Sequence, residues 1–267
     1  MWTAVIQMQS TRDRKANCAR AHRLIEQAAH RGARLIALPE YFLGLGPPAA
    51  LVEQAQDLDG PLLQTFRAQA RELQIYLLLG TIPERAPDPA KVYNTSLLLG
   101  PEGQLLAHYR KLHLFTIDIP DKVSFQESSY ILAGREVVAV TLPAEQWTVG
   151  LAICYDLRFP ELFRALVDRG AEIIVVPSAF SQVTGKDHWE TLLRARAIEN
   201  QVYILAPALS HHPDQSLKTY GRSLIIDPWG LVLAQAPDRE EIISARLDRQ
   251  YLLQLRAELP CLTNRCL

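Results

Sequence analysis

Amphipathic stretches and short apolar runs alternate along most of the chain, which is typical of proteins that mix helices and strands. Between Cys18 and His30 apolar residues recur at helical spacing, and Gly32 follows as a helix stop signal. The same pattern predicts later helices, one of which begins at a proline, a residue favoured in the first helical turn. These helices are expected over Leu62–Leu73, Pro160–Arg169, Trp189–Asn200 and Leu247–Leu259.

The apolar runs between the helices have the length of strands. Ile173–Val176 is β-branched throughout and is expected at the centre of a sheet, whereas Ile75–Leu79 is expected to end at Gly80. Turn-forming residues at 100–103 and 227–230 join two pairs of runs and predict antiparallel hairpins. The predicted strands are Ala4–Met8, Leu35–Leu38, Ile75–Leu79, Thr95–Leu99, Gln104–Tyr109, Val137–Leu142, Thr148–Ile153, Ile173–Val176, Val202–Ala206, Ser223–Ile226 and Leu231–Gln235.

Helices that alternate with strands, with hairpins inserted, predict mixed sheets rather than one purely parallel sheet. Connections are short and no Ser/Gly-rich linker or fixed-period repeat interrupts the pattern, so one α/β domain is expected over residues 1–267. A chain of this length with 48% hydrophobic residues can bury a sizeable core without disulfides.

Charge and cysteine usage narrow the class of protein. The net charge is -1 and the charges are interleaved, which argues against a nucleic-acid or membrane partner. The chain starts without a signal-peptide pattern and has no apolar run near the ~20 residues of a membrane span, so a cytoplasmic location is expected. No two cysteines have Cys-x-x-Cys spacing, which argues against a zinc site and fits a reducing compartment. The cysteines are Cys18, Cys154, Cys261 and Cys266.

Three predicted strands each run out just before a reactive side chain. Glu40 follows one such strand, Lys111 follows the next, and Cys154 follows a third. Ligands of open α/β sheets collect outside the carboxyl ends of strands. If these strands are neighbours, a carboxylate, an ammonium and a thiol meet in one crevice.

That trio suits amide hydrolysis. Glu40 can take the thiol proton as Cys154 attacks and then pass it to the leaving amine. Lys111 and the backbone N–H of Tyr155 can hold the negative charge on the carbonyl oxygen, and a helix beginning near Phe159 would add a positive dipole end. Taken singly, Cys154 is more typical of a small buried hydrophobe, Glu40 of a surface carboxylate and Lys111 of a solvated lysine.

Three segments resemble the signature segments of the nitrilase (carbon–nitrogen hydrolase) superfamily, in the family's order and at its separations. They are Leu38–Glu40, Tyr109–Leu114 and Cys154–Glu161. Further matches extend the resemblance over nearly the whole chain. These matches are Tyr93-Asn94, Phe125–Ser128, Pro177–Phe180, His188–Glu190, Arg194–Asn200 and Gly221–Ser223.

The resemblance implies a four-layer α–β–β–α sandwich and a Glu–Lys–Cys triad that maps onto Glu40, Lys111 and Cys154. It also implies a second glutamate, Glu127, which would hold the Lys111 ammonium and orient the amide or the water. No metal and no organic cofactor are expected. The family further implies a homodimer or a larger homo-oligomer.

Within the superfamily the chain is most similar to the amidase branch, on segments that include Lys111–Phe115, Ser178–Phe180 and His188–Glu190. The expected activity is that of a deaminated glutathione amidase, which releases 2-oxoglutarate and Cys-Gly. The alternatives are an ω-amidase acting on 2-oxoglutaramate or 2-oxosuccinamate, or another amidase or carbamoylase of the superfamily. A non-enzymatic scaffold is disfavoured, because all four reactive positions are present.

The loops 41–48 and 181–183 match no branch signature and should border the pocket. A dicarboxylic substrate needs a cation for its far carboxylate, and Arg158, Arg194 and Lys186 are candidates. Arg158 has a structural alternative, a pairing with a neighbouring acid, Asp156 or Glu161. The expected substrate contacts are Tyr155, Arg158, Phe180 and Thr184.

Overall fold

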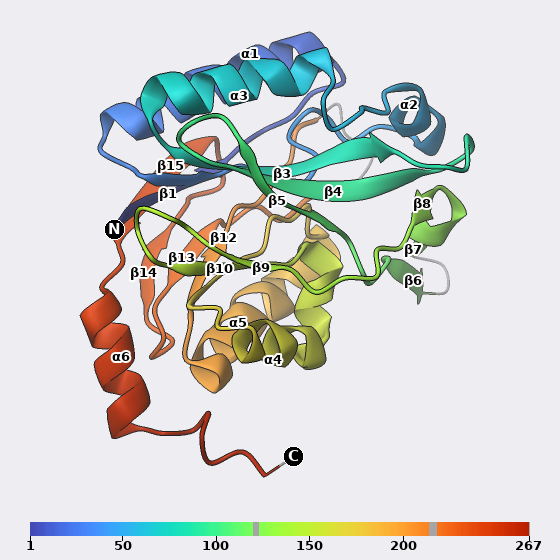
Figure 1. The fold of residues 1–267 in the computed structure, drawn as a ribbon. Helices are drawn as coiled ribbons and strands as arrows, with labels where there is room; N and C mark the ends of the chain where they lie inside the picture. Colours follow the sequence, from blue (N-terminus) through green and yellow to red (C-terminus); the bar gives the residue numbers. More distant parts are fainter. Residues whose placement is uncertain (120–122, 214–217, 267) are drawn as a thin grey trace.

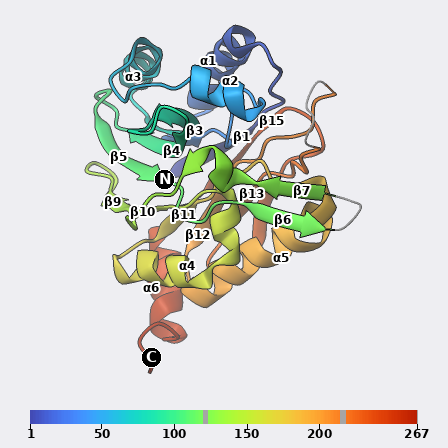
Figure 2. The same ribbon diagram turned by 90° about the vertical axis from the view of Figure 1, so that its right-hand side faces the viewer.

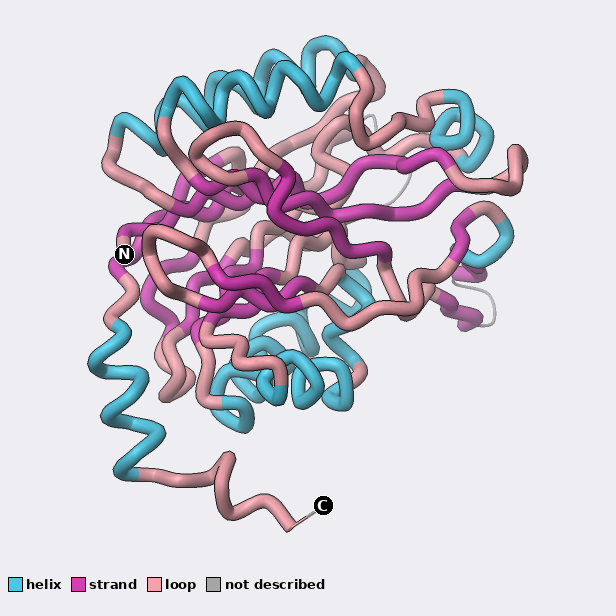
Figure 3. Tube along the Cα trace, viewed as in Figure 1, coloured by secondary structure: helices cyan, strands magenta, loops and turns pink. Residues whose placement is uncertain are grey.

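Two mixed β-sheets lie face to face between two outer layers of helices (Figures 1 and 3). The computed structural model describes residues 1–119, 123–213 and 218–266. This arrangement confirms the expected α–β–β–α sandwich. Within the described residues, no helix is both long enough and apolar enough to cross a membrane.

The first sheet has the strand order β15-β1-β2-β3-β4-β5, and β8 pairs with β4 at one end. Strands β1, β2 and β3 run parallel, and so do β4 and β8. The pairs β15–β1, β3–β4 and the predicted β4–β5 hairpin run antiparallel. The strands are β1 (Trp2–Gln7), β2 (Leu35–Ala37), β3 (Tyr76–Arg85), β4 (Val92–Leu99), β5 (Leu105–Arg110), β8 (Ile131–Leu132) and β15 (Glu241–Arg246).

The second sheet has the order β14-β13-β12-β11-β10-β9, with parallel strands in the middle and antiparallel strands at both edges. The β-branched strand β11 is central, as predicted. The strands are β9 (Ala139–Thr141), β10 (Thr148–Leu151), β11 (Ile173–Val175), β12 (Tyr203–Ala206), β13 (Leu224–Ile226) and β14 (Val232–Gln235). A separate antiparallel ribbon, β6 (Thr116–Ile119) and β7 (Val123–Gln126), projects beside α5 (Figure 2).

Helices α1 and α3 cover the outer face of the first sheet, and α4 and α5 cover the outer face of the second (Figure 1). Helix α6 extends away from the layers towards the C-terminus. The helices are α1 (Arg14–His30), α2 (Pro48–Glu53), α3 (Pro61–Leu73), α4 (Pro160–Asp168), α5 (Gln182–Asn200) and α6 (Arg249–Glu258). Two 3₁₀ helices, η1 (Glu127–Ser129) and η2 (Cys154–Arg158), lie between strands.

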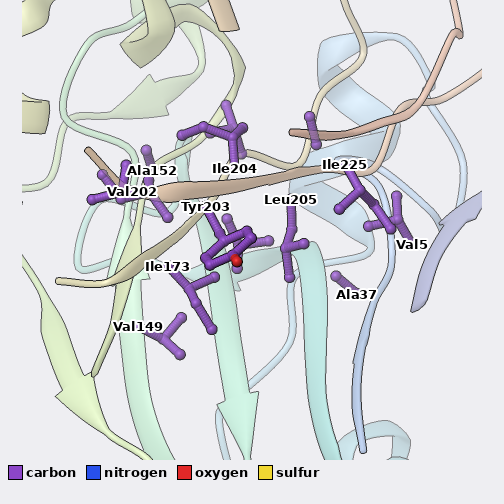
Figure 4. Close-up of a cluster of buried hydrophobic side chains, with 14 of the residues drawn as sticks. Val5, Ala37, Val149, Ala152, Ile173, Val202, Tyr203, Ile204, Leu205 and Ile225 are labelled. Carbon is purple, nitrogen blue, oxygen red and sulfur yellow. The ribbon is translucent and has the colours of Figure 1, made fainter. Parts of the chain in front are cut away.

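The main core lies between the two sheets (Figure 4). Val5 and Ala37 of the first sheet share it with Val149 and Ile173 of the second, and all four are fully buried. The intervening residues of the first sheet, such as Ile36, point the other way into a second core under the helices. Because successive strand residues face opposite sides, both faces of these strands must be apolar, which explains their continuous apolar runs.

Several boundaries differ from those predicted. Strand β3 continues through Gly80 to Arg85, with an irregular register against β4 that accommodates the glycine. Helix α1 begins earlier, because the Asp13 side chain caps it by accepting from the Ala16 N–H at 3.0 Å. Helix α5 begins at Gln182 rather than at Trp189, because the side chain of the preceding residue, Ser181, caps it. The sequence pattern missed α2, β6, β7, β8 and β15.

Candidate active site

Glu40, Lys111, Glu127 and Cys154 all line one cavity. The strands that lead to them are not neighbours, as the strand-end argument assumed. Strands β2 and β5 belong to the first sheet with β3 and β4 between them, and β10 belongs to the second sheet. The groups therefore meet because the two sheets face each other, with the ends of β2, β5 and β10 at the same side of the sandwich.

The Lys111 ammonium lies between two carboxylates. Its Nζ is 3.0 Å from Glu40 Oε1 and 2.9 Å from Glu127 Oε2, and all three side chains are at most 2% exposed. Burial alone would lower the pKa of Lys111, but Glu127 and Glu40 more than offset this, and the pKa is raised well above its ordinary value. The ammonium is therefore permanently charged at neutral pH.

Both carboxylates are held in place by further donors. Glu40 accepts from the Asn94 side-chain amide at 2.8 Å through Oε1, and from the Ala179 N–H at 2.8 Å through Oε2. Glu127 accepts from the Tyr41 hydroxyl at 2.9 Å and from the backbone N–H of Phe115 at 2.6 Å. Each carboxylate therefore has a fixed orientation towards Lys111, which a loop carboxylate in solvent would not have.

Asn94 and Tyr41 belong to this cluster although sequence reasoning did not select them as site residues. Asn94 donates to Glu40 and also contacts the Tyr41 hydroxyl at 3.0 Å. The available signal was the Tyr93-Asn94 match within the family resemblance and the position of Tyr41 directly after Glu40. Both side chains would have been identified only by knowing which strands face the cavity.

The turn that carries Glu40 rests against the backbone of β3. A Cβ atom on Gly80 would lie 2.1 Å from the Leu38 carbonyl oxygen and 2.2 Å from that of Pro39, so only glycine fits there. Tyr41, the residue after Glu40, has a left-handed φ of 54° and donates its N–H to Thr81 Oγ1 at 2.9 Å. This contact sets the depth to which the Glu40 carboxylate reaches.

Cys154 is the first residue of η2 and has a left-handed φ of 47°. This conformation is unfavourable for a residue with a Cβ and occurs where the surrounding structure imposes it, often at functional sites. Its N–H donates to the Pro177 carbonyl at 3.0 Å. Burial raises the pKa of the thiol well above its usual range, and so do the charge of Glu40 and the hydrogen bond to it, whereas Lys111 acts in the opposite direction.

Asp156, fully buried, braces the turn that holds Cys154. It accepts from the Ile153 N–H at 2.8 Å, from the Tyr109 hydroxyl at 2.7 Å and from the His113 backbone N–H at 3.0 Å. The His113 ring contacts it through Nδ1 at 2.7 Å and stacks on Phe159. The segment that follows β5 is thus joined to the segment that follows β10.

The expected structural alternative for Arg158 is wrong. Asp156 is occupied by the contacts above, and within the described residues Arg158 forms no ion pair with Asp156 or Glu161. Its guanidinium carbon lies 5.3 Å from the centre of the Phe180 ring, and its Nη1 lies 3.3 Å from His188 Nδ1. Arg158 is therefore a cation at the cavity wall without a carboxylate partner among the described residues.

The structure separates the candidate substrate contacts into two groups. Tyr155, Arg158, Phe180 and Thr184 line the cavity. The other basic candidates do not: Lys186 is exposed, and Arg194 contacts Glu190 and the Gly230 carbonyl away from the cavity. The rest of the wall is mainly apolar and aromatic, with Tyr41, Leu45, Phe115, Phe125, Tyr130, Ala179 and Ser181.

A thiol, a carboxylate that can accept its proton, and a fixed ammonium surround one small apolar cavity. Such a set can attack a carbonyl carbon, move one proton and stabilise the negative oxygen that results. The mainly apolar walls lower the local polarity, which strengthens each of these electrostatic interactions.

Known proteins share this architecture. The chain matches the carbon–nitrogen hydrolase family over residues 3–257. It is 40% identical over 263 residues to the deaminated glutathione amidase of Synechocystis sp. (strain PCC 6803 / GT-S), covering 98% of this chain and 97% of that protein. It is also 40% identical over 257 residues to omega-amidase NIT2 of Homo sapiens, covering 96% and 92% of the two chains. The C. elegans NitFhit protein superposes with a TM-score of 0.92 at 39% identity over 99% of this chain, which spans 65% of that longer chain.

Proposed function

The chain belongs to the carbon–nitrogen hydrolase family and hydrolyses amide C–N bonds, and we propose that it does so through Cys154, Glu40, Lys111 and Glu127. The observation that carries the proposal is the buried Lys111 ammonium held between two carboxylates beside a thiol in a left-handed conformation. The resemblance inferred from the signature segments is confirmed by the family match.

In the first half-reaction the Cys154 sulfur attacks the amide carbon and its proton moves to Glu40. The raised pKa of the thiol means that the proton stays on sulfur until this carboxylate removes it, so attack and proton transfer occur together. The C–N bond then breaks as Glu40 returns the proton to the nitrogen. The amine leaves, and the acyl group remains on sulfur as a thioester.

Lys111 and the Tyr155 N–H stabilise the negative carbonyl oxygen. The ammonium is fixed before the substrate arrives, and the N–H lies in the first turn of η2, where helical N–H groups have no acceptor within the helix. Glu127 holds the ammonium and orients the amide or the water. In the second half-reaction water attacks the thioester, Glu40 takes its proton, and the proton returns to the sulfur as the acid leaves.

The proposed substrate is deaminated glutathione, with ω-amides such as 2-oxoglutaramate as the alternative. Both have an acyl group that ends in a carboxylate. Among the described residues that line the cavity, Arg158 is the cation available for it, and Thr184 lines the same cavity. Lys111 is unsuited to this role, because Glu40 and Glu127 already neutralise it. Relatives of both names align over nearly the whole chain.

A substrate panel tests the proposal. Purified protein is incubated with deaminated glutathione, 2-oxoglutaramate, succinamate, a simple nitrile and a carbamoyl amino acid, and released ammonia or free amine is measured. We expect turnover of the first two amides, and none by Cys154→Ala. Turnover that persists in Cys154→Ala would remove the thiol from the mechanism.

We also propose that the chain forms a homodimer in the cytoplasm. Large apolar side chains stand exposed around the β13–β14 turn and α5, namely Trp229 at 61%, Leu231 at 59% and Ile198 at 49% exposure. Exposed apolar patches of this kind typically mark protein interfaces. Four free cysteines are compatible with a reducing compartment.

A further inference from the structure

A second cavity adjoins the catalytic one. It is lined by Thr11, Arg12, Ala50 and Gln54 together with the loop after Glu40, and its volume is about 470 Å³. The free volume of the catalytic cavity is only about 50 Å³. Leu45 lines both, so the two cavities meet at this residue of the loop. We call the second one the outer cavity.

The loop that leads to Leu45 is anchored on the outer side. Gly44 has a φ of 128°, and a Cβ there would lie 3.0 Å from the Thr11 carbonyl oxygen, so the loop backbone lies directly on this segment. The Asn17 side chain links the two loop segments, because it donates to the carbonyls of Thr11 at 2.8 Å and Leu43 at 3.0 Å. Leu45 follows this anchored point and is only half-buried, with a glycine after it.

The outer cavity has a basic residue, Arg12, in its lining. The Arg14 guanidinium lies next to the lining, where it donates to the carbonyl of Gln54, a lining residue, at 3.1 Å. The second terminal nitrogen of Arg14 is buried and has no hydrogen-bond partner among the described residues. The catalytic cavity has Arg158 at its wall for the carboxylate of the acyl half. A ligand that spans both cavities can therefore carry a second carboxylate in the outer one.

The amide cleaved at Cys154 has two halves, and the outer cavity offers more free space for a peptide than the catalytic cavity does. Resting on the proposed function, we propose that the outer cavity binds the amine half of the substrate, a short peptide-like amine that ends in a carboxylate. The acyl half extends to Arg158, on the wall formed by η2, and the amine half passes Leu45 towards Arg12 and Arg14. An ω-amide releases ammonia and leaves the outer cavity unused.

Two substrates with the same acyl group test this directly. Deaminated glutathione carries the Cys-Gly amine, and 2-oxoglutaramate carries only ammonia. Ala50→Trp fills the outer cavity, because Ala50 lines it and does not line the catalytic cavity. Ala49→Trp is the matched control, since Ala49 is the exposed neighbour on α2 and lines neither cavity.

We expect Ala50→Trp to lower kcat/KM for deaminated glutathione by about tenfold or more and to change that for 2-oxoglutaramate by less than about twofold. Ala49→Trp should leave both values near wild type. The retained turnover of 2-oxoglutaramate also shows that the variant is folded. In the wild type, amidation of the carboxylate on the amine half of the substrate should raise KM, because the negative charge near Arg12 is lost.

The outcomes separate the inference from the proposed function. If the wild type hydrolyses both amides and Ala50→Trp slows both equally or neither, the outer cavity does not hold the amine. If the wild type cleaves only 2-oxoglutaramate, the inference fails and the ω-amidase alternative stands. If the wild type cleaves neither, the proposed substrate class is wrong, and the inference falls with it.

Discussion

The Tyr109 hydroxyl donates to Asp156 Oδ2 across 2.7 Å, and this buried hydrogen bond joins the two sheets behind the catalytic cavity. Tyr109 lies two residues before Lys111, and Asp156 lies two residues after Cys154. The distance between the ammonium and the sulfur is therefore set partly by a pair that does not touch the cavity.

Tyr109→Phe should lower both stability and turnover. A hydrogen bond to a charged group contributes about 1.5–3 kcal/mol, and its loss leaves Asp156 with one donor fewer. Urea unfolding and kcat measure the two effects. Tyr203→Phe is the control: its hydroxyl accepts from and donates to the Asp248 backbone, both at 3.1 Å, so stability should fall while kcat stays near wild type. Equal loss of kcat in both variants would contradict a positioning role for Tyr109.

Lys111→Met should destabilise the fold and reduce kcat. It leaves Glu40 and Glu127 buried without a counter-ion, which costs about 3–5 kcal/mol. Removal of an oxyanion donor lowers kcat by roughly 10²–10³-fold. The double variant Lys111→Met/Glu127→Gln removes one of the two carboxylate charges, so it should recover stability in a thermal melt but not kcat. Recovery of kcat in the double variant would show that the ammonium acts only structurally.

Glu40→Gln should lower the pKa of the Cys154 thiol while it lowers activity. The wild-type pKa is raised first by burial and then by the Glu40 charge and hydrogen bond, so removing the charge favours the thiolate. At a given alkaline pH the variant therefore carries more thiolate than the wild type. Absorbance at the thiolate band, taken as a difference against Cys154→Ala, measures this, and kcat should fall by roughly 10²–10⁴-fold. An unchanged thiol pKa would contradict the contact between these two groups.

Arg158→Gln should raise KM for amides whose acyl group ends in a carboxylate. A hydrogen bond to a charged group contributes about 1.5–3 kcal/mol, so KM for 2-oxoglutaramate should rise by about tenfold or more. KM for butyramide, which has no carboxylate, should change little. Arg194→Gln is the control, since Arg194 lies outside the cavity. An equal rise in KM for 2-oxoglutaramate and butyramide would show that Arg158 shapes the cavity wall and does not bind the carboxylate.

Trp229→Glu should shift the protein towards the monomer. A carboxylate placed in an apolar interface would lose its hydration on association. Size-exclusion chromatography with light scattering gives the mass. Trp2→Glu makes the same chemical change at an exposed tryptophan on the first sheet and should leave the mass unchanged. If the wild type is itself a monomer, the proposed dimer is wrong.

Most of the fold could be predicted because its strands are buried on both faces. Runs such as Ile173–Val176 are long enough and apolar enough to be recognised without any alignment. Strands β6, β7 and β8 were missed because they are short or form an isolated ribbon, which leaves no strong apolar pattern. Strand β15 is an edge strand that mixes polar and apolar residues without strict alternation, and it was likewise missed.

The site was harder to predict in its spatial detail. The strand ends before Glu40, Lys111 and Cys154 were visible, but the facing of two sheets was not, and the assumption of neighbouring strands was wrong. The role of Asp156 depends on Tyr109, 47 positions earlier and in the other sheet. Nothing in the local sequence of either residue indicates that contact.

Gly80 limits how this enzyme can be re-engineered. Its backbone passes so close to the turn before Glu40 that a methyl group would displace the turn, although Gly80 does not line the catalytic cavity. A mutagenesis library aimed at new acyl groups can diversify the aromatic wall, but any substituent at position 80 displaces the turn that carries Glu40, the proposed general base. An activity screen would then score variants at position 80 as poor substrate binders, although their defect is a displaced turn where two backbone segments pass in close contact.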